Sequence, residues 1–373
     1  MKHYMPTRVL FGRRAVSRLS DEIDYLRLNT ERTAVICGSS AVSMGYTKKI
    51  SEQIEGGKVE VFPFVKQDPT VENAEEVLSA VREFKPTLIV AVGGGSPLDV
   101  SKVVSVMLTN EGDIRNFIGI PEAFKNPGIP VIAVPTTSGS GSEVTPYAVL
   151  TDRNKLRKAP LISRFLFPVL AVDDPELTLS MPQFVTANTG IDALTHAIES
   201  FLSKRATPLS RLHSLEAIKL IFRYLPRSFG NPKDIEAREK VMFGSLLGGM
   251  AITDAGAGLV HTLAHILGVL YGVPHGLANG VFLIPVLEFY GLSISSQVEE
   301  ISKYLNIPPE RFIPFLREFL SFFGFPEKAS SLGLKKDDIS LFISLAMEKK
   351  HLMGNLPRIP TERDLRVILE RLI

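Results

Sequence analysis

Short apolar runs alternate with helical patterns through the first half of the chain. The runs are rich in Val and Ile, and the segments between them carry apolar residues at helical spacing, as from Val71 to Val81 behind a predicted N-cap at Thr70. Strands that alternate with helices predict a parallel sheet with helices on both faces. The predicted strands cover residues 33–37, 59–62, 87–92, 131–134 and 169–172.

The pattern changes near residues 173–175, and beyond them almost all of the periodicity is helical. Clusters of Pro and Gly, such as those around Pro226 and Pro232, separate the predicted helices. Because 373 residues are many for one core, we predict an α/β domain with a parallel sheet over residues 1–180 and an all-α domain over residues 181–373. The predicted helices cover residues 184–202, 210–224, 234–250, 259–271, 308–323, 336–347 and 361–372.

Composition excludes several classes of protein. Hydrophobic residues make up 45% of the chain, the formal net charge is +2, and no basic block occurs, so neither a nucleic acid nor an anionic membrane is expected as a partner. The single cysteine, Cys37, excludes an internal disulfide framework, and no apolar leader is visible; both favour the cytoplasm. The uncharged stretch 255–287 is long enough for a membrane span, but its three histidines and six glycines favour a buried helical core.

Two loops that follow predicted strands have the composition of an anion site. Three glycines, Gly93 to Gly95, precede a helix that is expected to open at Ser96, so backbone N–H groups can meet an anion with no Cβ in the way. A loop rich in hydroxyl groups, 135–145, follows the next strand. Either loop alone is compatible with a turn that binds nothing, but two loops at the carboxyl ends of parallel strands favour a dinucleotide site.

The turn after the first predicted strand bears on the choice of coenzyme. An acidic residue there would bind the ribose of NAD and repel the 2′-phosphate of NADP. This chain has Gly38 at that position, followed by Ser39 and Ser40, whose hydroxyl groups can bind a phosphate. We therefore expect NADP(H) to be favoured over NAD(H).

Four of the seven histidines fall in two apolar segments of the second domain. Asp192 and His196 are four residues apart, on one helix face, and a buried carboxylate needs a partner, either a metal ion or a core histidine. His261 and His265 repeat this spacing, and His275 follows. Spacing leaves open whether His265 or His275 is a ligand, and three imidazoles with a carboxylate suit Fe(II) or Zn(II).

Four motifs, at residues 93–102, 135–145, 190–199 and 261–276, resemble those of the iron-containing (group III) alcohol dehydrogenase family. The resemblance spans nearly the whole chain and implies a dehydroquinate synthase-like architecture. It implies an enzyme that transfers hydride between a small alcohol or aldehyde and NADP(H) or NAD(H). It also implies a divalent ion, Fe(2+) or alternatively Zn(2+), and a homodimer is a candidate assembly.

The resemblance carries site residues over to this chain. It implies that His265 lies beside the nicotinamide as a catalytic residue and is not a ligand. The implied metal ligands are Asp192, His196, His261 and His275. The implied dinucleotide contacts are Gly94, Gly95, Ser96, Thr136, Thr137 and Lys158, with Asp99 and Lys102 on the helix that supports the loop.

One segment departs from the family pattern, and two rival functions share the architecture. Residues 351–358, expected near the substrate pocket, lack the acidic residue that often precedes Asn-Pro-Arg in the family. A glycerol dehydrogenase-type polyol oxidoreductase lacks the residue that corresponds to His196. A dehydroquinate synthase-like lyase needs basic residues around a polyanionic substrate, and we expect almost none to be buried in the segment 192–275.

Overall fold

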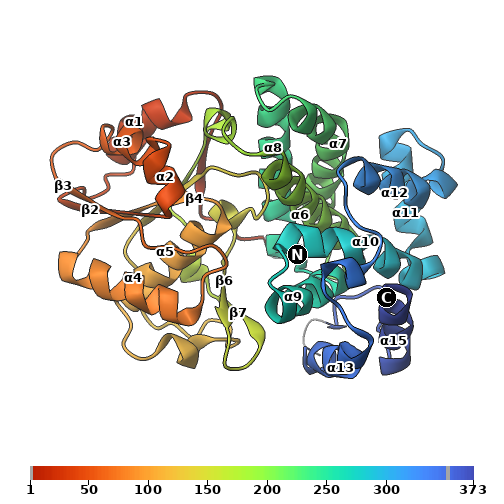
Figure 1. Cartoon of the computed structure of the whole chain (residues 1–373). Helices are drawn as coiled ribbons and strands as arrows, with labels where there is room; N and C mark the ends of the chain where they lie inside the picture. Colours follow the sequence, from red (N-terminus) through yellow and green to blue (C-terminus); the bar gives the residue numbers. More distant parts are fainter. Residues whose placement is uncertain (1–2, 350–352) are drawn as a thin grey trace. The chain divides into compact units, whose positions relative to one another are not determined.

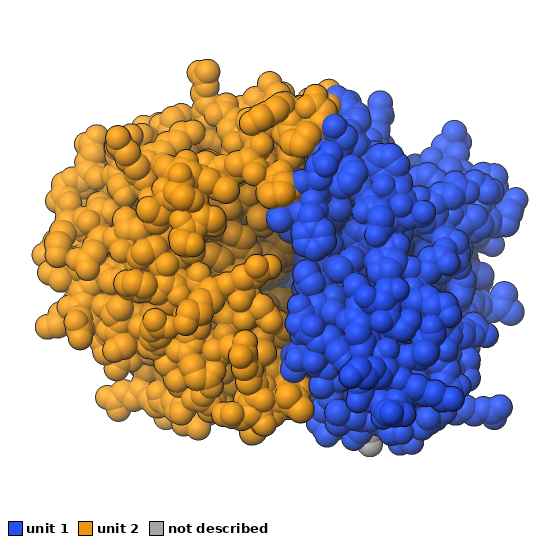
Figure 2. All heavy atoms as spheres, viewed as in Figure 1, with its two compact units in different colours: residues 1–3, 183–230, 243–373 blue, residues 4–182, 231–242 orange. Residues whose placement is uncertain are grey.

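The computed structural model describes residues 3–349 and 353–373 and consists of two compact units (Figure 2). The α/β unit is made of Tyr4–Pro182 and Asn231–Met242, and the helical unit of Gln183–Gly230 and Phe243–Ile373, with His3. The chain thus returns to the α/β unit for one short segment. The predicted domains, residues 1–180 and 181–373, did not include this return, and they stay a prediction.

The α/β unit is built on a six-stranded parallel sheet in the order β1-β8-β5-β4-β2-β3. Figure 1 labels β2, β3 and β4 of this sheet. All five predicted strands belong to it, and the predicted fold class is confirmed. The first strand was not predicted, and it joins the sheet at one edge beside the last strand. The strands are β1 (Arg8–Phe11), β2 (Arg32–Cys37), β3 (Lys58–Phe62), β4 (Leu88–Gly93), β5 (Val131–Pro135) and β8 (Leu170–Asp173).

Helices cover both faces of the sheet because its central strands are apolar on both sides. Along β4, Ile89 and Ala91 face one core, whereas Leu88 and Val90 face the other. Thr70 accepts a hydrogen bond from the backbone of α4, as its predicted role as N-cap requires. The first core is closed by α4 (Val71–Phe84) and α5 (Gly95–Met107), and the second by α1 (Leu19–Tyr25), α2 (Ser39–Ser43) and α3 (Tyr46–Ser51).

One pair of strands in the α/β unit is antiparallel and was not predicted. β6 (Tyr147–Asp152) and β7 (Arg157–Ile162) form a two-stranded ribbon. Leu150 and Leu161 of this ribbon are buried in the same core as α5. The sequence conceals the second strand because Pro160 interrupts it, and proline argues against a strand.

The helical unit differs from the predicted helices at two prolines and in two helices that were not predicted, α10 and α11. Pro226 lies inside α7 instead of separating two helices, since Leu225 and Ser228 beside it are buried, and this packing outweighs one lost backbone hydrogen bond. Near Pro308, α12 begins only at Phe312, after a short 3₁₀ turn. The helices are α6 (Gln183–Leu202), α7 (Pro208–Gly230), α8 (Ile235–Ala255), α9 (Leu259–Tyr271), α10 (His275–Tyr290), α11 (Ser295–Leu305), α12 (Phe312–Phe322), α13 (Ile339–Glu348) and α15 (Glu362–Arg371).

The uncharged stretch of the sequence forms buried helices. The helical stretch His275–Leu305 has the length and hydropathy of a membrane span, yet 67% of its most apolar window is buried, as in a core helix. Within the described residues, a second candidate exists only if α8 and α9, which are bent by 106° relative to each other, are counted as one span. One buried base was not expected: Arg238 is 1% exposed and donates to the carbonyl groups of Pro232 and Met181 within the α/β unit.

Candidate metal centre and dinucleotide loops

Three helices of the helical unit bring the predicted metal ligands together. Asp192 and His196 lie one turn apart on α6, both 7% exposed, and Nε2 of His196 is 3.8 Å from Oδ1 of Asp192. α9 supplies His261, whose Nε2 is 3.7 Å from the same oxygen. His275 is the first residue of α10, and its Nε2 is 3.4 Å from that oxygen.

A glycine turn positions His275. α9 ends at Gly272, which adopts φ +69 and so reverses the chain in a conformation that favours glycine. Pro274 then precedes the first turn of α10. Because α10 packs against both α6 and α9, this short connection returns His275 to the ring of His261, with 5.3 Å between the two ring centres.

The donor set fits a divalent ion. A tetrahedral site with bonds of about 2.1 Å places its ligand atoms about 3.4 Å apart, close to the separations of 3.4 to 3.8 Å found here. Nδ2 of Asn279 donates to Oδ1 of Asp192 at 2.7 Å, and the other atom of this amide, Oδ1, has no hydrogen-bond partner among the described residues although it is buried. A cluster of three imidazoles and one carboxylate suits iron or zinc.

Electrostatics couple the ligands to one another. Burial would raise the pKa of Asp192, but the imidazoles of His196, His275 and His261 hold it well below its usual range. Burial would lower the pKa of His261, but the carboxylates of Asp192 and Glu199 raise it to about 9. A metal ion that binds Nε2 of this ring must therefore displace a proton near neutral pH.

His265 lies beside this cluster, one turn after His261 on α9. Its ring stacks on His275, with 5.0 Å between ring centres and 29° between ring planes. Its ring centre is 6.2 Å from that of His261. The group of side chains close enough to share one ion contains Asp192, His261 and His275 among the described residues, and both His196 and His265 are outside it. His351 and Leu352, the start of the segment 351–358, lie outside the described residues.

Sequence reasoning missed Glu199. Its carboxylate oxygen Oε2 is 2.6 Å from Nδ1 of His261. The signal was available, because Glu199 follows Asp192 by seven residues and His196 by three, which places all three on one face of α6.

In the α/β unit, the two predicted loops lie against each other. A Cβ on Gly94 would come within 3.0 Å of Oγ1 of Thr137, and a Cβ on Gly95 within 3.1 Å of Ser140. The backbone N–H of Thr136 donates to the carbonyl of Gly93 at 2.9 Å. α5 begins at Gly95, one residue before the predicted start, so its N-terminus opens directly onto this junction.

Two features make the junction suitable for a phosphate. The loop places the first N–H groups of a helix of 13 residues at the junction, and the helix dipole favours an anion there. Oγ of Ser138 is buried and has no hydrogen-bond partner among the described residues. Among the predicted contacts, Gly94, Gly95, Ser96, Thr136 and Thr137 all belong to the two loops.

Asp99 and Lys102 hold the second loop from beneath. Oδ1 of Asp99 accepts from Oγ of Ser142 at 2.5 Å, and Oδ2 accepts from the backbone of Val149 at 2.9 Å. Nζ of Lys102 donates to the carbonyl of Ser142 at 2.9 Å. Burial lowers the pKa of Lys102 to about 8, although Asp99 opposes this shift. Asp99 thus reaches the loop through its own oxygens, and its contact with a dinucleotide stays a prediction.

The remaining predicted contacts lie elsewhere in the α/β unit. Lys158, on β7, donates to Asp68 and to Oγ1 of Thr151. Gly38 precedes α2, and Ser39 and Ser40 form its exposed first turn. A Cβ on Gly38 would come within 3.2 Å of the carbonyl oxygen of Val65, whereas its φ of −93 is open to any residue.

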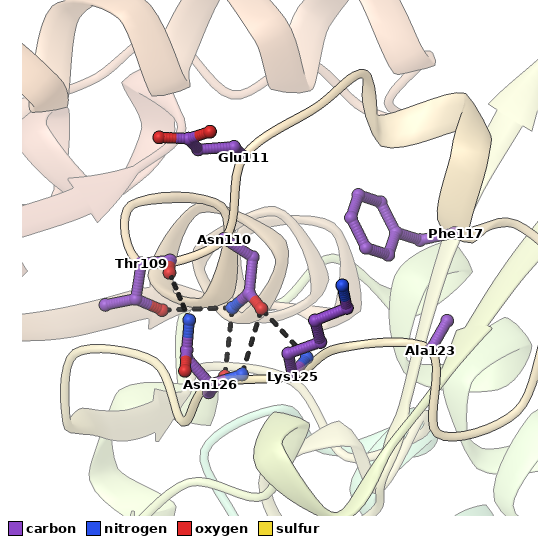
Figure 3. Close-up of a pocket in the computed structure, with 7 residues that line it drawn as sticks. All are labelled: Thr109, Asn110, Glu111, Phe117, Ala123, Lys125 and Asn126. Carbon is purple, nitrogen blue, oxygen red and sulfur yellow. Dashed lines mark hydrogen bonds between the residues drawn. The ribbon is translucent and has the colours of Figure 1, made fainter.

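A pocket of about 330 Å³ lies at the opposite end of α5 from the glycine loop (Figure 3). The helix has 13 residues and therefore separates the two by about 20 Å. Oδ1 of Asn110 accepts from the backbone N–H groups of Lys125 and Asn126 at 2.9 and 3.0 Å, so these polar groups satisfy one another. The lining residues are Thr109, Asn110, Glu111, Phe117, Ala123, Lys125 and Asn126.

Comparison with known proteins gives matches along nearly the whole chain. Residues 6–175 match the family model for iron-containing alcohol dehydrogenase, and residues 186–373 match the model for the C-terminal part of the Fe-containing alcohol dehydrogenase family. The chain is 31% identical to the NAD-dependent methanol dehydrogenase of Bacillus methanolicus, with 98% of each chain covered. It is 32% identical to the 1,3-propanediol dehydrogenase of Klebsiella pneumoniae, with 99% of this chain and 98% of that protein covered. A crystal structure of a 1,3-propanediol oxidoreductase matches with a TM-score of 0.94 at 30% identity, covering 100% of this chain and 99% of that one.

Proposed function

Because this chain belongs to the iron-containing alcohol dehydrogenase family, it is a metal-dependent oxidoreductase of alcohols and aldehydes, and we propose that the cluster on α6, α9 and α10 holds its ion. The proposed ligands are Asp192, His196, His261 and His275. The observation that carries the proposal is the convergence of three imidazole Nε2 atoms within 3.4 to 3.8 Å of one carboxylate oxygen.

The ligands of this cluster determine the net charge around a bound ion, and His265 lies next to them. When bound, a divalent ion supplies Lewis-acid polarisation of the substrate oxygen. Asp192 is the one anionic ligand in the proposed set, so the loaded cluster keeps a net positive charge that favours an alkoxide over a neutral alcohol. We propose that His265, stacked on His275, lies beside the nicotinamide and relays a proton.

We propose that the two loops of the α/β unit bind the dinucleotide of the same reaction. Glycines let backbone N–H groups approach the pyrophosphate, and the close contact of Gly94 and Gly95 with the second loop supports a shared cradle. The proposed contacts are Gly94, Gly95, Ser96, Asp99, Thr136, Thr137 and Lys158, with Gly38, Ser39 and Ser40 toward the ribose.

NADP(H) is the coenzyme we propose as favoured. The turn at Gly38 has no carboxylate to repel a 2′-phosphate, and the exposed Ser39 and Ser40 can donate to one. The name of the Bacillus methanolicus relative, an NAD-dependent enzyme, points the other way. The ratio of kcat/KM for NADPH and NADH decides between them, and a higher value with NADH rejects the preference. Ser39→Asp is the sharper variant, because a side chain at Gly38 would crowd Val65.

The substrates we propose are small alcohols and their aldehydes, as the names of the methanol and 1,3-propanediol relatives suggest. His196 stands in the cluster, which argues against the glycerol dehydrogenase type. We also propose two functional domains, residues 1–180 and 181–373, a cytoplasmic location and a homodimer.

The test of the proposed function is oxidation of NADPH or NADH with a panel of aldehydes, before and after chelation and after Fe(2+) or Zn(2+) is restored. Activity that survives complete removal of metal would contradict the proposed function.

A further inference from the structure

Glu199 lies on the face of α6 that carries Asp192 and His196. It is 5% exposed, and a buried carboxylate is costly unless donors surround it. The donors come from the start of α9. Oε1 accepts from the backbone N–H of Val260 at 2.6 Å, and Oε2 accepts from that of Gly258 at 2.9 Å.

These contacts make Glu199 the cap of α9. The first N–H groups of a helix have no partner within the helix, and the N-cap residue of α9 is Gly258, which has no side chain to offer. Glu199 supplies the missing acceptor from another helix, at the end of α9 where the helix dipole favours a negative charge. The start of α9 is thereby fixed relative to α6.

The same carboxylate fixes the ring of His261. Oε2 of Glu199 lies 2.6 Å from Nδ1 of His261. Both oxygens already accept backbone N–H groups, so the proton of this contact belongs to Nδ1. Nε2 is then the ring atom left for a metal, and it is the one that lies 3.7 Å from Asp192. Metal-binding histidines commonly donate their second N–H to a carboxylate, which fixes their tautomer and orientation.

Gly258 allows the carboxylate to approach. A Cβ at this position would lie 2.5 Å from Oε1 of Glu199 and 2.8 Å from its Cδ. The φ of Gly258 is −119, which any residue adopts, so its lack of a side chain, and not its conformation, is what the site uses.

We propose that Glu199 is a positioning residue that holds His261 in the tautomer and orientation the metal requires, so that the cap of α9 and the metal affinity depend on one carboxylate. The inference rests on the metal site proposed above. It adds a residue outside the ligand set, with an effect on affinity that a helix cap alone would not have.

The test is the dissociation constant for Zn²⁺, measured on the metal-free full chain by competition with a chromophoric chelator. Glu199→Gln keeps the size of the side chain but replaces one acceptor oxygen by a donor. We expect the Kd to rise 10–100-fold, and the absorption spectrum of the Co²⁺-loaded protein to change. Gly258→Ala keeps glutamate at position 199, but the new Cβ would displace its carboxylate. The Kd for Zn²⁺ should therefore rise in this variant too.

Thr361→Ala is the matched control. Thr361 caps α15 in the same unit through a hydrogen bond to the backbone of Asp364, so its loss should lower the Tm of the metal-free chain and leave the Kd unchanged. Glu199→Gln with a lower Tm but the parent's Kd would overturn the inference and make Glu199 a cap only. If Glu199→Gln does not fold, the Kd of Gly258→Ala decides, and the parent's value again overturns it. Failure of the parent chain to bind Zn²⁺ or Fe²⁺ would instead reject the proposed metal site itself.

Discussion

The two candidate sites of this protein are built in opposite ways. The metal cluster consists of ionisable side chains from three helices, and each of its three histidines presents Nε2 to Oδ1 of Asp192. The dinucleotide loops consist of backbone brought close by glycines, with side chains such as Lys102 serving to hold the second loop. Removing a side chain should therefore be most damaging at the cluster, and adding one should be most damaging at the loops.

The largest effect is expected from Asp192→Ala. This change removes the proposed anionic ligand, so we expect metal content to fall below a tenth of the parent value. We expect kcat/KM to fall by about 10³-fold or more, because several kcal/mol of charge stabilisation is lost. Elemental analysis and steady-state kinetics measure both. His213→Ala, at a half-buried histidine on α7, is the control and should keep its metal. Full metal occupancy in Asp192→Ala would refute the ligand set.

His265→Ala tests whether His265 is a metal ligand or a neighbour of the ligands. Because His265 stacks on His275 and is not in the proposed ligand set, metal content should stay near the parent value. Loss of a proton relay should lower kcat by about 10²-fold and change its pH profile. If metal is lost, His265 is a ligand and His275 comes into question. If kcat is unchanged at every pH, the ring only packs.

Gly94→Ala tests the dinucleotide loops by adding a side chain where they meet. The new Cβ would lie 3.0 Å from Oγ1 of Thr137, so the side chain of Thr137 must shift. Overpacking of this kind costs about 1–3 kcal/mol, so we expect the Kd for the dinucleotide to rise about tenfold while metal content stays constant. Fluorescence titration with NADPH measures the change. Gly230→Ala, where a Cβ meets nothing within 4 Å, serves as the control. An unaltered Kd in Gly94→Ala would remove Gly94 from the site.

The smallest effect is a pH dependence of stability in the α/β unit. Burial raises the pKa of Glu143 to about 7, with Asp99 adding to the shift and Lys102 opposing it. The folded chain therefore keeps a proton that the unfolded chain loses near pH 4.5. The free energy of unfolding should fall as the pH rises from about 4.5 to about 7. Thermal melts of the metal-free chain measure this, and Glu143→Gln should flatten the dependence. Equal slopes for the two chains would contradict the assignment.

Local pattern was enough to predict much of the fold, whereas the full ligand set of the cluster came from the family resemblance, because spacing left both His265 and His275 open. α9 spans the predicted residues 259–271, because Gly258 and Gly272 bracket its apolar run. The spacing of Asp192 and His196 predicted their shared face on α6. The central strands β2, β4 and β5 come from short apolar runs, which are typical of a sheet that is buried on both sides.

Three features that depend on contacts between distant segments were missed. β1 is a strand because it pairs with β8, about 160 residues later, and little in Arg8–Phe11 indicates this. The role of Glu199 depends on the meeting of α6 with the start of α9. The amide of Asn279 reaches Asp192 only because α10 folds back on α6.

The short return of the chain to the α/β unit has a consequence for synthesis. Segment Asn231–Met242 belongs to that unit, and its Arg238 is buried there against the carbonyl of Met181. On a ribosome, residues 183–230 of the helical unit emerge before this segment does. We expect the α/β unit to reach its full resistance to protease only after residue 242 has emerged, when part of the helical unit has already left the ribosome.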